Sequence, residues 1–77
     1  MNSLVSNTET GAISVHFDSE ITKVLIINIS GVVELEKLIK TRRRFTIHSN
    51  QFHAGKYLVQ FIKRDKVIDG LKLAIKI

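Results

Sequence analysis

The stretch FHAGKYLVQF, residues 52–61, contains a glycine turn followed directly by the clearest strand pattern in this 77-residue chain. From Lys56 to Lys63, alternate positions form two faces of an extended segment. One face carries Tyr57, Val59 and Phe61, and the other carries Leu58, Gln60 and Ile62. The stretch therefore predicts a β-strand that begins immediately after a sharp turn at His53-Ala54-Gly55.

The segments on both sides of this stretch also read as short strands. Residues 13–17 alternate apolar and polar side chains, and residues 71–77 do the same up to the last residue. Residues 24–29 are nearly all apolar and β-branched, which predicts a central strand covered on both faces. Short strands separated by turns, including one at Arg64-Asp65, predict an all-β fold: an antiparallel β-sandwich of about six to seven strands. We place the sandwich at residues 13–77 and read residues 1–12, which are small and polar, as a flexible lead-in.

The segment VVELEKLIK, residues 32–40, is ambiguous. Leu35, Leu38 and Ile39 fit helical spacing, and Glu, Lys and Leu favour helix. The same segment fits an interrupted strand, and its neighbours are strands joined by short turns. We therefore predict the second arm of a hairpin. Residues 45–47 follow as a short strand, and residues 48–55 form a polar connection with Phe52 as its buried anchor.

Composition indicates a single globular domain. Hydrophobic residues make up 44% and charged residues 25% of the chain, values outside the disordered range. The absence of cysteine excludes disulfides and thiolate metal sites. No signal peptide is visible at the start, and no apolar run approaches the roughly 20 residues of a transmembrane helix.

The net charge of +5 is spread unevenly. Residues 1–36 carry one lysine against five acids, whereas residues 37–66 carry nine basic residues against one acid. The run Arg42-Arg43-Arg44 is a possible patch for an anionic partner, such as an acidic protein, a nucleic acid or a lipid headgroup. The aromatic residues occupy inward strand positions, however, so a charged turn that discourages edge pairing is the preferred interpretation, and we expect no nucleic-acid partner.

Catalytic and metal-binding patterns are lacking. His48 and His53 fall on a polar connection, His16 is distant in sequence, and no nucleophile elbow, zinc motif or phosphate loop occurs. We therefore expect no enzyme activity, no metal site and no cofactor.

Three segments together resemble the C-terminal sorting domains (type A) of the type IX secretion system. KVLIINISG (23–31) looks like that family's strand followed by Asn-x-x-Gly. FTIHSNQFHAGKYLVQF (45–61) is similar to its short strand, polar link and Gly-x-Tyr strand, and LKLAIKI (71–77) is similar to its terminal strand with two lysines. The order and spacing match over residues 13–77. The family's proline-containing motif is missing, Ser49 replaces an apolar residue, and the Arg42–Arg44 run is not a family feature.

The resemblance implies an immunoglobulin-like sandwich at the end of a larger exported protein. Such a domain directs its N-terminal cargo domain across the outer membrane, to the cell surface or the extracellular space. The implied partners are outer-membrane components of the secretion and attachment machinery, including a sortase-like cysteine peptidase that commonly removes the domain. The lead-in before Ile13 is where that peptidase would find unstructured chain. The flush end at Ile77 suggests a natural carboxy terminus.

Six residues are candidates for recognition or for the fold. Gly31 and Gly55 are predicted to permit sharp turns, and Tyr57 to anchor its strand in the core with the hydroxyl at a polar rim. Lys72, Lys76 and the carboxylate of Ile77 are the better candidates for direct contact with a partner, and the terminal strand could also be captured by strand addition.

Two alternatives belong to other classes of function. One is an immunoglobulin-like interaction or signalling module retained on a surface protein, which predicts a durable partner and no cleavage. The other, less favoured, is a small basic nucleic-acid-binding domain, which steep salt dependence of binding would reveal.

Overall fold

A computed structural model describes residues 2–7, 9–40 and 42–76, and these residues form strands, connecting loops and one 3-10 turn. The strands are β1 (Ser3–Ser6), β2 (Ala12–His16), β3 (Lys23–Asn28), β4 (Val33–Leu38), β5 (Arg44–His48), β6 (Gly55–Lys63) and β7 (Lys66–Ile75), with the turn η1 at Ser49–Gln51.

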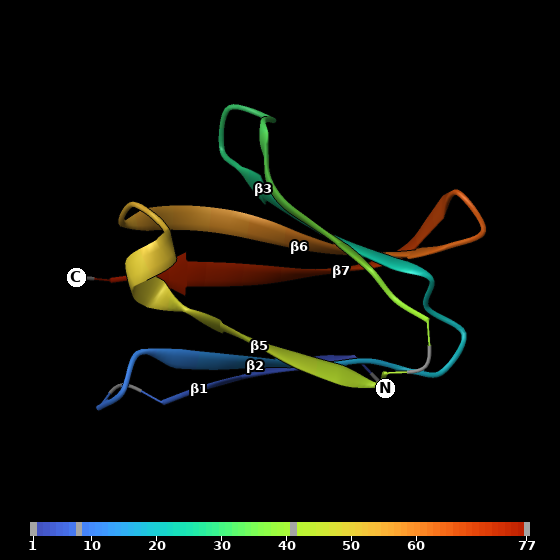
Figure 1. Ribbon diagram of the computed structural model, residues 1–77. Helices are drawn as coiled ribbons and strands as arrows, with labels where there is room; N and C mark the ends of the chain where they lie inside the picture. Colours follow the sequence, from blue (N-terminus) through green and yellow to red (C-terminus); the bar gives the residue numbers. More distant parts are fainter. Residues whose placement is uncertain (1, 8, 41, 77) are drawn as a thin grey trace.

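Two antiparallel sheets face each other (Figure 1), which confirms the predicted sandwich. One sheet has the strand order β1-β2-β5 and the other β4-β3-β6-β7. Immunoglobulin domains divide their first, second and fifth strands from their third, sixth and seventh in the same way. The chain follows that division, with β4 added beside β3.

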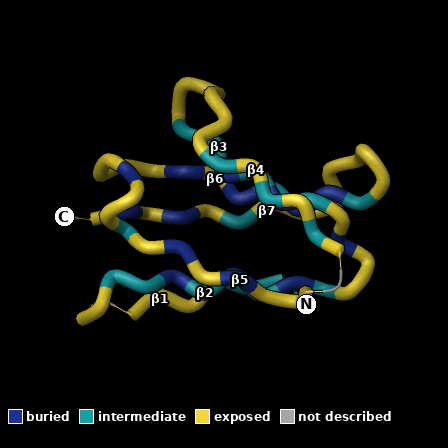
Figure 2. Tube along the Cα trace, viewed as in Figure 1, coloured by how far each residue is buried: buried dark blue, intermediate teal, exposed yellow. Residues whose placement is uncertain are grey.

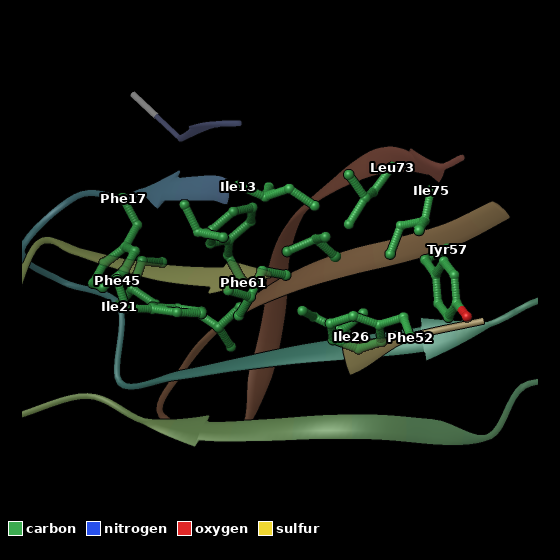
Figure 3. Packing of buried hydrophobic residues seen from close by; sticks show 14 residues of the cluster. Ile13, Phe17, Ile21, Ile26, Phe45, Phe52, Tyr57, Phe61, Leu73 and Ile75 are labelled. Atoms are coloured by element: carbon green, nitrogen blue, oxygen red, sulfur yellow. The ribbon is translucent and has the colours of Figure 1, made fainter. Parts of the chain in front are cut away.

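The core lies between the two sheets as one cluster of buried apolar side chains (Figures 2 and 3). The predicted inner face of β6 is buried, with Tyr57 8% exposed and Val59 and Phe61 fully covered. Phe17 joins the sheets through ring contacts with Phe45 and Phe61, at centroid distances of 5.9 and 6.5 Å. Such tilted aromatic pairs add to the stabilisation from area burial.

Strand β3 is central, as predicted, but the expectation that both of its faces are covered is wrong. Val24 and Ile26 are fully buried, whereas Leu25 and Ile27 are only partly covered. The sandwich has two layers, so the four-stranded sheet has a core on one face only. Its outer face therefore exposes apolar side chains.

The expected lead-in is wrong for Ser3–Ser6, which forms β1 and pairs with β2. Leu4 lies opposite Val15 and packs against the core. The side chain of Asn2 accepts the N–H of Asp18 at 3.1 Å and donates to Asp69 at 2.9 Å. Pairing with the exposed edge of β2 satisfies backbone groups that a flexible segment would leave to water.

The ambiguous segment 32–40 contains β4, so the choice of strand is confirmed. Its register with β3 runs from Lys23 opposite Leu38 to Ile27 opposite Val33, with a bulge between Ile26 and Ile27. Leu35 on this strand packs against the core. Pairing along β3 and burial of this face therefore outweigh the helical propensity of the segment.

The remaining segments also follow the prediction. The Arg64-Asp65 turn has φ values of 48° and 67°, as a tight two-residue hairpin turn requires. Strand β7 begins at Lys66, earlier than the predicted terminal strand, because its pairing with β6 continues past a bulge at Phe61 and Ile62. The predicted alternation holds where it is described, with Leu73 and Ile75 buried; Ile77 lies outside the described residues.

Candidate functional site

Tyr57 stands at the start of β6 and ties the preceding connection to the sandwich. Its hydroxyl donates a hydrogen bond of 2.7 Å to the carbonyl oxygen of His53, four residues upstream. Its ring meets Phe52 edge-on, with centroids 5.5 Å apart (Figure 3). A tyrosine at this corner of an immunoglobulin-like sandwich makes the same kind of backbone hydrogen bond. Gly55 enters the strand with φ at +153°, which disfavours residues with a side chain.

The β3–β4 turn is built around Asn28, whose side-chain oxygen accepts the N–H groups of Ser30 and Val32 at 2.9 and 3.0 Å. Its backbone carbonyl accepts the N–H of Gly31 at 3.0 Å, and its side-chain nitrogen donates to Glu34 at 2.9 Å. Gly31 has φ at +83°, a left-handed conformation. The predicted residues included Gly31 but missed Asn28, although an asparagine before a turn commonly hydrogen-bonds backbone groups in this way.

The structure brings the three motif segments together at one end of the four-stranded sheet. Asn28 on β3 lies opposite Tyr57 on β6, which in turn lies opposite Leu73 on β7. The Asn-x-x-Gly turn, the Gly-x-Tyr strand and the terminal strand are therefore neighbours in space. Their separation in sequence gives no direct indication of this arrangement.

Lys72 and Lys76 are both exposed but border different hollows. Lys72 lies opposite Leu58 on the outer face of the sheet and lines a groove of about 450 Å³. We call this the sheet groove; its lining residues are Asn28, Ile29, Lys56, Tyr57, Leu58, Lys72 and Ala74. Lys76 instead lines a hollow of about 500 Å³ with Asn7, Gly11 and Ser49, at the end of the sandwich near the β1–β2 turn. The two lysines thus do not form a single site.

The Arg42–Arg44 run lies on the β4–β5 side, away from β7. All three arginines are exposed, and the backbone carbonyl of Arg43 accepts the N–H of Phe17 at 2.9 Å. Arg42 lines a hollow of about 330 Å³ together with Lys37, Leu38 and Lys40. The structure therefore adds two lysines to the predicted basic patch.

The aromatic side chains offer no platform for stacked bases. The four phenylalanines and Tyr57 are all within the part of the chain that the structure describes, and none is more than 9% exposed. Proteins that hold single-stranded nucleic acid stack bases on exposed aromatic rings. The geometry thus gives the basic patch no aromatic partner for that purpose.

Among the described residues, no group of three or more His, Cys, Asp or Glu side chains is arranged to hold a metal ion. The backbone carbonyl of His53 accepts the hydrogen bond from the Tyr57 hydroxyl. Within residues 2–7, 9–40 and 42–76, no helix is long and apolar enough to span a membrane.

Comparison with known proteins gives one assignment. The family model described as "Secretion system C-terminal sorting domain" matches residues 7–76, which is nearly the whole chain. The comparison with curated protein sequences returns no match. As its three motifs predict, the chain belongs to the family of C-terminal sorting domains of the type IX secretion system.

Proposed function

We propose that this domain directs a larger cargo protein through the type IX system to the cell surface, where a sortase-like peptidase removes it and the cargo is attached. The observation that carries the proposal is the family match over residues 7–76. The convergence of the three family motifs around Asn28, Tyr57 and Leu73 supports it, because a recognition surface needs its parts in one place. The domain itself acts as the sorting signal, and no catalysis is assigned to it.

Removal by a peptidase needs an extended, accessible segment. Residues 3–6 are paired with β2 as an edge strand, and Asn2 is held by Asp18 and Asp69. We therefore propose that cleavage occurs in the cargo linker before Asn2, or after β1 has detached from the sheet. β1 is short and lies at an edge, so it is the strand whose detachment disturbs the fold least.

A periplasm-directed fluorescent protein carrying residues 1–77 at its end tests the sorting function in a cell with a working type IX system. We expect this fusion to reach the surface or medium. Deletion of Leu71–Ile77 does not separate loss of recognition from loss of the fold, because it removes Leu73 and Ile75 from the core. The sharper variant is Lys72→Glu with Lys76→Glu, which alters exposed charges only. Retention of the folded intact fusion in the periplasm would contradict the proposal.

The immunoglobulin-like module retained on a surface protein is the second candidate, favoured by the sheet groove and by the exposed apolar residues Ile29 and Leu58 that line it. The two functions differ in the fate of the domain. Mass spectrometry of the exported fusion distinguishes them: a cargo that ends before Asn2 or within β1 (Ser3–Ser6) supports removal, and an intact C-terminal domain supports retention.

A further inference from the structure

An exposed apolar surface surrounds the β3–β4 turn. We call it the hairpin surface; it consists of Ile27, Ile29, Val32, Val33 and Leu58. Ile29 is 84% exposed, Val32 55%, Val33 47% and Leu58 37%. Strand pairing places Val33, Ile27 and Leu58 in one row across three strands. The turn projects away from the body of the sandwich (Figure 1). A cluster of this kind, unlike a single exposed aliphatic residue, marks an interaction site.

Backbone N–H groups of the β3–β4 turn are already hydrogen-bonded within the turn, which favours its burial in an interface. The N–H groups of Ser30, Gly31 and Val32 are all bonded to Asn28 within the turn, at 2.9 to 3.0 Å. A buried N–H without a partner would oppose docking, since its desolvation would not be compensated. The desolvation penalty of these three N–H groups is therefore small when the turn enters an apolar environment. No charged residue occurs between Lys23 and Glu34.

Charges of both signs surround the hairpin surface. Lys56 and Lys72 line the sheet groove on the β6–β7 side, and Glu34 and Glu36 are exposed on β4. An apolar centre with a mixed polar rim is the anatomy of a protein–protein interface. Membrane-binding segments instead combine Trp, Phe or Leu with many basic residues, and the two glutamates would repel an anionic lipid surface.

We propose that the hairpin surface docks onto a protein partner whose contact region is apolar at its centre, acidic toward Lys56 and Lys72, and basic toward Glu36. Ile29 is the central anchor, because it is the most exposed of the apolar side chains and lines the sheet groove. The proposal rests on the sorting function, since it places the partner in the outer membrane of the exporting cell.

Binding of the purified domain to outer-membrane fragments of a type IX-secreting cell tests this assignment. Fragments are used untreated and protease-treated, alongside vesicles of phosphatidylethanolamine and phosphatidylglycerol. The variant is Ile29→Ser, and the matched control is Val67→Ser, which removes an aliphatic side chain that is 55% exposed on β7. Both positions are exposed, so the variants should fold. We expect Ile29→Ser to weaken binding to untreated fragments about tenfold or more, and Val67→Ser to have little effect.

Lys72→Glu should also weaken binding, and protease treatment should abolish it. Three results would overturn the proposal: no binding to untreated fragments, equal binding to vesicles, or equal effects of Ile29→Ser and Val67→Ser. Export of the same variants as fluorescent fusions separates this proposal from the sorting function. If the Ile29→Ser fusion is exported and binds as the wild type does, the docking site is refuted and sorting stands. If the wild-type fusion is not exported, the sorting function itself fails.

Discussion

Replacing Tyr57 with phenylalanine isolates the hydroxyl that ties β6 to the preceding connection. The substitution deletes the 2.7 Å hydrogen bond to the carbonyl of His53 and leaves the ring against Phe52. Tyr57 is buried but His53 is exposed, so water can partly replace the lost donor at the His53 carbonyl. A hydrogen bond of this kind contributes about 0.5–1.5 kcal/mol, and we expect a loss near the middle of that range.

For a domain of this size, a loss of about 1 kcal/mol lowers the melting temperature by about 4–8 °C. Urea unfolding followed by circular dichroism should show a lower midpoint with an unchanged slope, because the exposed area on unfolding is the same. Tyr57→Leu serves as the comparison, since it also removes the ring contact with Phe52 and should cost more. A melting temperature for Tyr57→Phe equal to that of the wild type would refute the structural role assigned to the hydroxyl.

The remaining predictions use the same unfolding measurement. Asn28→Ala should cost about 1–2 kcal/mol, because two backbone N–H groups of the turn lose their acceptor; an unchanged midpoint would contradict this. Gly31→Ala should cost about 1–2 kcal/mol through backbone strain alone, since φ is +83° and no atom lies within 4 Å of an added Cβ; Gly31→Asn should cost less. Phe61→Ala should lower the free energy of unfolding by about 3–5 kcal/mol, because the side chain is fully buried. A smaller loss than that of Tyr57→Phe would contradict the burial of Phe61 in the core. Lys63→Ala should change the free energy of unfolding by less than about 1 kcal/mol, since the side chains of its ion pair with Glu20 are 44% and 47% exposed. A larger loss would contradict the weak contribution expected of an exposed ion pair.

Local residue patterns predict the strands over most of the chain. Period-two alternation at 13–17, 56–63 and 71–77 is a direct consequence of extended backbone with one face buried. The turns at Gly31, Gly55 and Arg64-Asp65 follow from local backbone chemistry, which needs no distant partner. The three segments that resemble the family, 23–31, 45–61 and 71–77, contain the turns at Gly31 and Gly55 and all or most of two of these alternating strands.

Other features depend on pairing and packing between segments that are distant in the sequence. β1 is a strand because the edge of β2 offers it backbone partners, and SLVS alone has too weak a pattern to show this. The four central positions of β3, residues 24–27, are all apolar, so only the two-layer architecture decides which face is buried. β4 is a strand because its pairing with β3 outweighs its helical propensity.

The candidate site depends even more on long-range pairing. Asn28, Tyr57 and Leu73 meet because β6 pairs with both β3 and β7, and these are contacts between residues far apart in sequence. Ile29 lies in the turn just after the last paired residue of β3 and is exposed beside the sheet groove, although its neighbours in the sequence suggest a core residue. Local sequence indicates most of the strands, whereas pairing between distant segments makes β1 and β4 strands and determines which side chains share a surface.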